Sequence, residues 1–126
     1  MDEIAGRIKG TPQYEDLKAC DLIIEAAVEN LELKIKIFGE LSDICPEDTI
    51  MVSNTSTFLI EKVMEKVSNP ARTAGLHYFF PANVNRLVEV IRQKNTSDDT
   101  FNAVNEFALK NKKNCHFCKG FPGVCH

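Results

Sequence analysis

Residues 21–38, DLIIEAAVENLELKIKIF, join a short apolar run to a segment with the periodicity of a helix. The run DLIIEAA (21–27) is continuous and rich in isoleucine, which favours a buried strand of a parallel sheet over a half-exposed strand. The helical segment repeats apolar side chains along one face, at Leu31, Ile35, Phe38 and Leu41. A strand that leads into a helix over 30–44 indicates a βαβ unit.

The rest of the chain continues this alternation. TIMVSN (49–54) predicts a second strand, and RTAGLHYFF (72–80) and RLVEVIR (86–92) predict two more around the turn-prone segment PANVN (81–85). NCHFC (114–118) is predicted as a final strand. Strands separated by helices of this length imply a parallel or mixed sheet covered by helices.

Two further helices are predicted between these strands. The first has a single apolar stripe, made by Leu59, Ile60, Val63, Met64 and Val67. Thr57 is its predicted N-cap. The second helix spans about 98–112 and packs through one face, made by Phe101, Val104, Phe107 and Ala108. The pattern as a whole predicts an α/β fold.

The composition is that of an ordinary globular domain. The chain has 126 residues, of which 44% are apolar, enough for one domain with a buried core. Its 15 basic and 18 acidic side chains are mixed along the chain, so neither nucleic acid nor a membrane surface is an expected partner. No apolar run reaches the roughly 18 residues of a spanning helix, and the start, MDEIAGRIKG, lacks the apolar core of a signal peptide. We expect a soluble intracellular protein.

A histidine and a carboxylate occupy the two strands around the predicted turn. If PANVN reverses the chain, His77 at the end of one strand can meet Glu89 on the next. A carboxylate that accepts an imidazole N–H fixes the tautomer and stabilises the imidazolium, which leaves the other ring nitrogen as a general base. The alternative is a core histidine whose hydrogen bond is satisfied by a neighbouring glutamate, and the pair alone leaves both interpretations open.

The segment SNTST (53–57) follows a predicted strand and precedes a predicted helix. Ligands of open α/β sheets bind beyond the carboxyl ends of the strands, where small hydroxyl and amide side chains can hydrogen-bond a substrate or cofactor without blocking it. Taken alone, the same residues would serve as a turn and a helix cap. Their position ahead of the strand that carries His77 favours the binding interpretation.

Four segments, DLIIEAAVENLELKIKIF, SNTST, GLHYFFPA and LVEVI, occur in an order and spacing that resembles the amino-terminal cofactor-binding domain of the L-3-hydroxyacyl-CoA dehydrogenases. The resemblance runs over nearly the whole chain. It implies a Rossmann-like fold, which in this family is followed by a helical domain that dimerises and completes the cleft. It also implies oxidation of the 3-hydroxyl of an acyl-CoA thioester to a ketone in fatty-acid β-oxidation, or the reverse reaction, with NAD as cofactor.

The resemblance also implies three residues that act on the substrate. The catalytic histidine of the family falls on His77, its partner glutamate on Glu89, and its substrate-binding serine on Ser56. His77 would take the hydroxyl proton while a hydride passes to the nicotinamide. Glu89 would orient His77 and balance its charge, and Ser56 would hydrogen-bond the reacting oxygen.

Four further positions are implied as contacts of NAD. Glu29 and Lys34, which follow the first strand, correspond to family NAD contacts, and Ala27 and Asn54 are added to them by the same resemblance. No metal is expected at this site. The partners that the resemblance implies are an acyl-CoA substrate and either a second copy of the chain or other parts of a parent chain.

The chain departs from the family pattern in three places. The glycine-rich turn G-x-G-x-x-G, which holds a pyrophosphate at a helix N-terminus, has no match, because Gly6 and Gly10 are too far apart and KGFPG lies at the wrong end. Phe80 stands where the family has Asn or Ser facing the cofactor. The chain also ends in KGFPGVCH, before the position at which the family supplies a catalytic asparagine.

We therefore expect residues 1–126 to form a partial NAD-binding domain that lacks the first βαβ unit and is inactive by itself, as part of a longer enzyme. The 21–27 strand would then present an unpaired apolar edge. The alternative function is that of a non-catalytic or degenerate module that keeps the fold and pairs with another chain. The expected location is the cytoplasm or the mitochondrial or peroxisomal matrix, since the chain shows no targeting signal.

The tail CHFCKGFPGVCH carries a separate pattern. Cys115 and Cys118 form a C-x-x-C, and Cys125 with His126 or His116 would complete four zinc ligands. Adjacent residues such as Cys125 and His126 point in different directions, which favours the alternative of ordinary reduced cysteines. The odd count of five cysteines also argues against a secreted disulfide framework.

Overall fold

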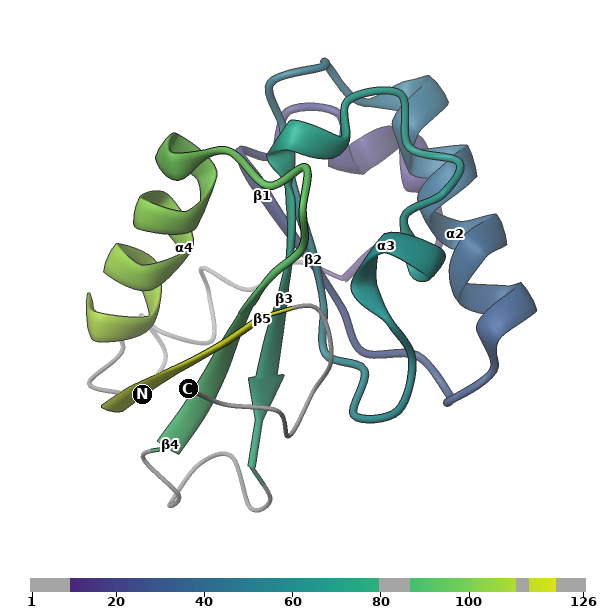
Figure 1. The fold of residues 1–126 in the computed structure, drawn as a ribbon. Coiled ribbons are helices and arrows are strands. Elements are labelled where there is room, and N and C mark those ends of the chain that lie inside the picture. The colour runs from purple at the N-terminus through teal and green to yellow at the C-terminus, as the bar shows by residue number, and fades with distance from the viewer. Residues whose placement is uncertain (1–9, 80–86, 111–113, 120–126) are drawn as a thin grey trace.

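The computed structural model describes residues 10–79, 87–110 and 114–119, the last range as backbone only. The described residues form five strands, with helical elements before each strand except β4, which follows β3 in the element order (Figure 1). The elements are η1 (Tyr14–Leu17), β1 (Leu22–Glu25), α2 (Leu31–Ile44), β2 (Ile50–Ser53), α3 (Ile60–Val63), η2 (Pro70–Arg72), β3 (Thr73–Tyr78), β4 (Leu87–Arg92), α4 (Asp98–Lys110) and β5 (Asn114–Lys119).

The strands form one mixed sheet in the order β1-β2-β3-β4-β5. β1, β2 and β3 run parallel to one another, β4 runs antiparallel to β3, and β5 is parallel to β4. The sheet has α4 on one face and α2 with α3 on the other (Figure 1). The predicted α/β class, the mixed sheet with flanking helices and the Rossmann-like character are confirmed.

Each face of the sheet has its own hydrophobic core, because successive side chains of a strand point to opposite faces. In β2, Met51 packs in the core under α2 and α3, while Val52 packs in the core under α4. In β4, Ile91 packs in the core under α2 and α3, and Val90 packs in the core under α4. The central strands are therefore covered on both faces, as their nearly continuous apolar sequences predict.

Gly75 in β3 allows two layers to pack closely. A Cβ atom at this position would lie 2.8 Å from Ile60 Cδ1 and 2.8 Å from Ile91 Cβ, closer than real Cβ contacts. The side chains of α3 and β4 therefore occupy the space that a larger residue in β3 would need. This contact fixes how α3 sits over the strand that continues to His77.

The helix boundaries follow from local capping. α2 begins after Asn30, whose side chain accepts a hydrogen bond from the backbone N–H of Leu33 at 3.1 Å, and it ends at Ile44 as predicted. The predicted N-cap Thr57 is wrong, since α3 begins only after Leu59 and has no side-chain cap. Thr55 has the turn role instead, because its Oγ1 accepts the N–H of Thr57 at 3.3 Å and that of Phe58 at 3.2 Å.

The helix predicted from the 59–67 stripe is shorter than its apolar pattern. α3 covers Ile60–Val63, after which the N–H of Val67 bonds to the carbonyl of Met64 in a tighter three-residue turn. Ser68 lies beyond the helix, and its N–H bonds to the hydroxyl of Ser42 in α2 at 2.9 Å. The apolar spacing is satisfied by packing on the core without further helical turns.

β1 lies at an edge of the sheet, where the described part of the chain pairs it only with β2. Ile23 is buried, but Ile24 is 38% exposed, so the prediction that both faces of this strand are buried is wrong at Ile24. The predicted apolar edge is confirmed within the described residues. The turn at 81–85, Phe80, Gly6 and the end of the tail lie outside the described residues. Over the ranges that the structure covers, no helix has both the length and the apolar character to cross a membrane.

Candidate active site

The carboxyl ends of three neighbouring parallel strands meet at one edge of the sheet. β1 ends at Glu25, β2 at Ser53 and β3 at Tyr78. Loops that carry polar side chains such as Glu29 and Ser56 follow the first two strands, over residues 26–30 and 54–59. This is the edge at which open α/β sheets bind ligands.

His77 and Glu89 are direct cross-strand partners of β3 and β4. His77 Nδ1 lies 2.8 Å from Glu89 Oε1, and the two side chains are 18% and 4% exposed. A carboxylate can only accept a hydrogen bond, so Nδ1 carries the proton and the lone pair remains on Nε2. The ring of Phe79 packs against the imidazole, with 5.0 Å between ring centroids. The predicted contact is confirmed, and its geometry is that of a general base with an orienting carboxylate.

Glu29 holds the SNTST loop through one carboxylate oxygen. Its Oε2 accepts hydrogen bonds from the backbone N–H of Ser56 at 2.9 Å, from the hydroxyl of Ser56 at 3.2 Å and from the hydroxyl of Thr55 at 2.9 Å. Burial alone would raise the pKa of Glu29, but the donors from Ser56 and Thr55 together with the ammonium of Lys34 lower this pKa from 4.5 to about 2. Glu29 is therefore ionised at neutral pH, as these contacts require.

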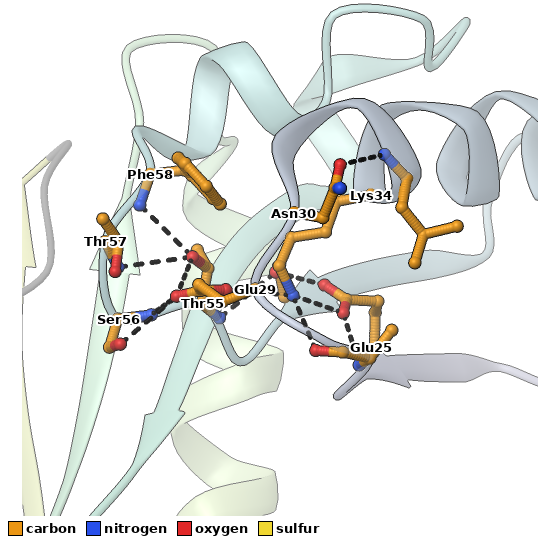
Figure 2. A network of polar contacts seen from close by, with 11 residues as sticks. Glu25, Glu29, Asn30, Lys34, Thr55, Ser56, Thr57 and Phe58 are labelled. Carbon is orange, nitrogen blue, oxygen red and sulfur yellow. Dashed lines mark hydrogen bonds and ion pairs between the residues drawn. The ribbon is translucent and has the colours of Figure 1, made fainter.

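Lys34 places a buried ammonium beside the two loops, with its side chain 1% exposed. Its Nζ lies 2.6 Å from Glu25 Oε2, 3.2 Å from Glu29 Oε1 and 3.2 Å from the carbonyl oxygen of Ala27. The three N–H donors of an ammonium thus face three oxygens, and Figure 2 shows how they converge from β1, its following loop and α2.

Asn54 connects the loop after β2 with the end of β3. Its backbone N–H donates to the carbonyl of Glu25 at 2.8 Å, and its side-chain Oδ1 accepts the backbone N–H of Tyr78 at 2.8 Å. Because Tyr78 directly follows His77, this bond ties the histidine strand to the loop that carries Ser56. Burial raises the pKa of the Tyr78 phenol, so this neighbour stays neutral at physiological pH.

The structure thus gathers the seven predicted site residues along one edge of the sheet in two groups. The first is the pair of His77 and Glu89. The second group is joined by the Glu29 and Lys34 contacts, and its members are Ala27, Glu29, Lys34 and Ser56. Among the described residues His77 makes no hydrogen bond with Ser56, and Asn54 is the link between the groups.

The sequence of the chain matches the model of a known family. The family model described as 3-hydroxyacyl-CoA dehydrogenase, NAD binding domain, matches residues 1–120. The chain belongs to this family. The resemblance predicted from four sequence segments is thereby confirmed, and membership of an NAD-binding domain family of oxidoreductases supports NAD as the cofactor.

Several dehydrogenases are similar to this domain. A probable 3-hydroxyacyl-CoA dehydrogenase of Caenorhabditis elegans is 44% identical over 103 residues, which cover 82% of this chain and 35% of that protein. A 3-hydroxybutyryl-CoA dehydrogenase of Clostridioides difficile is 42% identical over 106 residues, with coverage of 84% and 38%. The crystal structure of (S)-3-hydroxybutyryl-CoA dehydrogenase from Ralstonia eutropha matches with a TM-score of 0.93 and 42% identity, covering 97% of this chain and 43% of that one. The chain spans less than half the length of each of these relatives.

Two residues of the dehydrogenase-like site were missed by sequence reasoning. Glu25 is 5% exposed and accepts from Ser53 and Lys34, but in the sequence it is a single carboxylate in an apolar run. A charged residue inside a predicted buried strand must be paired, so the position of Glu25 in the run could have indicated a buried ion pair. Thr55 was missed because nothing in SNTST distinguishes it from Thr57 as a turn residue.

A metal centre has no donor set in the part of the chain with described side chains. There, no group of three or more His, Cys, Asp and Glu side chains comes close enough to hold a metal ion. The zinc alternative at Cys115, Cys118, Cys125, His116 and His126 falls on side chains outside that description.

Proposed function

We propose that this domain supplies the cofactor-binding half of an NAD-dependent L-3-hydroxyacyl-CoA dehydrogenase, which interconverts a 3-hydroxyacyl-CoA and a 3-oxoacyl-CoA. The observation that carries the proposal is the 2.8 Å contact between His77 Nδ1 and Glu89 Oε1 at the ligand-binding edge of the sheet. A satisfied core histidine would make the same bond. The location beside a second polar group, in a chain of this family, supports the catalytic interpretation.

His77 acts as the general base in the oxidising direction. Its Nε2 takes the proton of the substrate 3-hydroxyl, and Glu89 stabilises the imidazolium that forms through the hydrogen bond from Nδ1. In the reducing direction the same nitrogen returns the proton to the carbonyl oxygen. The buried position of Glu89, 4% exposed, strengthens its interaction with this charge.

Ser56 binds the reacting oxygen of the substrate. Its backbone N–H is fixed on Glu29 at 2.9 Å, and its hydroxyl lies 3.2 Å from the same carboxylate oxygen, so the side chain can rotate to an incoming ligand while the backbone stays in place. Ser56 itself is exposed, as a substrate contact requires.

The residues after β1 fit one side of a dinucleotide. Glu29 keeps its side chain 35% exposed and offers a carboxylate acceptor for a ribose hydroxyl, and Val28 beside it is 71% exposed and offers an apolar surface. Ala27 and Asn54 complete this side through their backbone and amide groups. Lys34 is the fourth proposed cofactor residue and acts through its positive charge beside Glu29. NAD, when bound here, supplies the hydride acceptor.

The complete enzyme includes parts beyond this domain, since the relatives are more than twice as long. We propose that it acts on acyl-CoA substrates as a homo-oligomer or with the remaining parts of a longer chain, in the cytoplasm or in a mitochondrial or peroxisomal matrix. The relatives include a peroxisomal fatty acid beta-oxidation multifunctional protein of Arabidopsis thaliana, 40% identical over 90 residues.

The test compares the complete enzyme that contains this domain with its His77→Ala and Glu89→Gln variants in acetoacetyl-CoA-dependent oxidation of NADH. We expect each substitution to lower kcat by about 10²–10⁴, the usual contribution of general acid–base catalysis. Glu40→Gln, an exposed change on α2, is the matched control and retains full activity. Unchanged turnover in the His77→Ala variant would overturn the proposal.

A second candidate function is a non-catalytic module that pairs with another chain, and the exposed edge of β1 is the observation that favours it. In this case the chain binds a protein partner, the complete protein shows no NADH oxidation, and His77→Ala does not change the binding of the partner.

A further inference from the structure

Glu25 is a buried carboxylate for which neither the family resemblance nor the chemistry above gives a role. It is 5% exposed at the end of β1. Its Oε2 accepts from the backbone N–H of Ala27 at 2.6 Å and from Lys34 Nζ at 2.6 Å, and its Oε1 accepts from the hydroxyl of Ser53 at 2.5 Å. A carboxylate is costly to bury and is retained when it is paired and hydrogen-bonded, as Glu25 is.

The contacts of Glu25 continue into the substrate loop. Lys34 binds Glu25 with one donor and Glu29 with another, and Glu29 holds the backbone N–H of Ser56 (Figure 2). Each link is a charge-assisted hydrogen bond, which is stronger and more directional than a neutral one. The ammonium of Lys34 is therefore placed between two carboxylates that belong to different parts of the site.

We propose that Glu25 is a positioning residue: by anchoring the ammonium of Lys34 it sets the orientation of the Glu29 carboxylate and, through it, of the Ser56 loop. The catalytic consequence rests on the function proposed above, in which Ser56 binds the reacting oxygen. The structural part, from Glu25 to the Ser56 backbone, stands on the described contacts alone. Glu25 touches neither substrate nor cofactor in this scheme.

The competing role for Glu25 is purely local. Its bond to the N–H of Ala27 closes the turn after β1, and this turn would need an acceptor even if Lys34 had no function. Glu25→Gln separates the two roles, because an amide oxygen still accepts the Ala27 N–H while the negative charge beside Lys34 is lost. Glu40→Gln, an exposed change on the same helix as Lys34, is the matched control.

The first measurement is amide hydrogen exchange of the protein without ligand, read at Ser56 by NMR. We expect Glu25→Gln to lower the protection of the Ser56 amide on the order of tenfold, because a Glu29 carboxylate that is no longer correctly oriented holds the Ser56 N–H less firmly. Core amides such as that of Val90 are expected to be unchanged. Glu40→Gln leaves both unchanged. Unaltered protection at Ser56 in Glu25→Gln would overturn the proposal whether or not the protein is an active dehydrogenase.

The second measurement covers the case in which Glu25→Gln weakens the whole fold. The double variant Glu25→Gln with Lys34→Met removes both buried charges together, which is far less destabilising than leaving one unpaired. The proposal expects core protection to recover in this variant while Ser56 stays unprotected, because Glu29 has lost its Lys34 contact. Recovery at Ser56 as well would show that Glu25 acts only on stability and would contradict the positioning role.

Kinetics connect the positioning role to the reaction. If Glu25 acts through Glu29, kcat/KM for the acyl-CoA falls on the order of tenfold in Glu25→Gln, and the double variant with Glu29→Gln is no worse than Glu29→Gln alone. Independent, additive losses would contradict the serial link. These kinetics are measured on the complete enzyme that contains this domain. An inactive complete enzyme would remove the proposed function, and the exchange data would still decide the structural part.

Discussion

Glu29 shows how a single carboxylate is held ionised by its neighbours. In the folded state its pKa is about 2, against an ordinary value of 4.5, because the donors from Ser56 and Thr55 and the charge of Lys34 outweigh the effect of burial. Because folding lowers the pKa of Glu29, its ionised contacts stabilise the fold, and this stabilisation is complete at pH values above the pKa of the unfolded chain. The stabilisation is lost as the pH falls from about 4.5 through about 2.

The corresponding prediction concerns acid stability. Glu29→Gln lowers the free energy of unfolding at pH 7, and the difference from wild type shrinks as the pH falls below about 4.5. Urea unfolding of both proteins across this range measures the difference. The side chain is 35% exposed, so water screens part of the effect. A difference that stays constant down to acidic pH would contradict this account.

The two charged contacts of the site differ in how far sequence reasoning could reach them. His77 and Glu89 lie equally far on either side of the PANVN segment, so a predicted hairpin places them opposite each other. The contact of Glu25 with Lys34 joins a strand to a helix across a loop. Its geometry depends on how α2 packs over β1, which no local pattern specifies. The same limit applies to the choice of Thr55 over Thr57.

At the scale of elements, the packing of α3 on β3 and β4 depends on the absence of a side chain at Gly75. Gly75→Ala is expected to destabilise the fold by about 1–3 kcal/mol, the usual cost of overpacking, because its Cβ would meet Ile60 and Ile91. Thermal or urea unfolding measures this cost.

Gly39→Ala is the matched control for Gly75→Ala. Its Cβ would meet Lys66 Cβ at 3.4 Å, an ordinary contact, so in the middle of α2 the change should stabilise by about 0.5–1 kcal/mol. Equal effects at the two glycines would show that packing does not distinguish them.

The order and type of the elements were largely predictable, and their lengths were less so. Apolar runs and helical stripes located each strand and α2 and α4, since burial itself creates those patterns. The stripe at 59–67 overstated α3, because the same apolar spacing is compatible with a tight turn once Val67 packs on the core. Hydrogen-bond partners such as Ser42 for Ser68 are tertiary and leave no local trace.

At the scale of the whole molecule, the edge of β1 is the surface at which we expect a second chain to bind. An exposed apolar edge strand with free backbone groups is a template for pairing with another chain. Within the described residues β1 pairs only with β2, and Ile24 is 38% exposed there. We expect the purified chain to self-associate through this edge.

Ile24→Lys should reduce this association with little effect on the fold, because a charged side chain on an edge strand opposes edge-to-edge pairing. Sedimentation velocity at several concentrations measures it. Leu109→Lys, at a residue of α4 that is 55% exposed, makes the same chemical change away from the sheet edge and should leave the mass distribution as in wild type. If both substitutions reduced self-association equally, the association would depend on exposed apolar side chains in general and not on the edge of β1.

The saturated ammonium of Lys34 also has a consequence for chemical damage. Acyl-CoA thioesters are acylating agents, and an enzyme that handles them exposes its own lysines to unwanted amide formation. Acylation needs a reagent to reach the side-chain nitrogen, and the Nζ of Lys34 already faces three oxygens. Burial adds a second barrier, since only 1% of the side chain is open to reagent. If the complete enzyme acts on acyl-CoA as proposed, the contacts and burial of Lys34 shield this side chain from acylation.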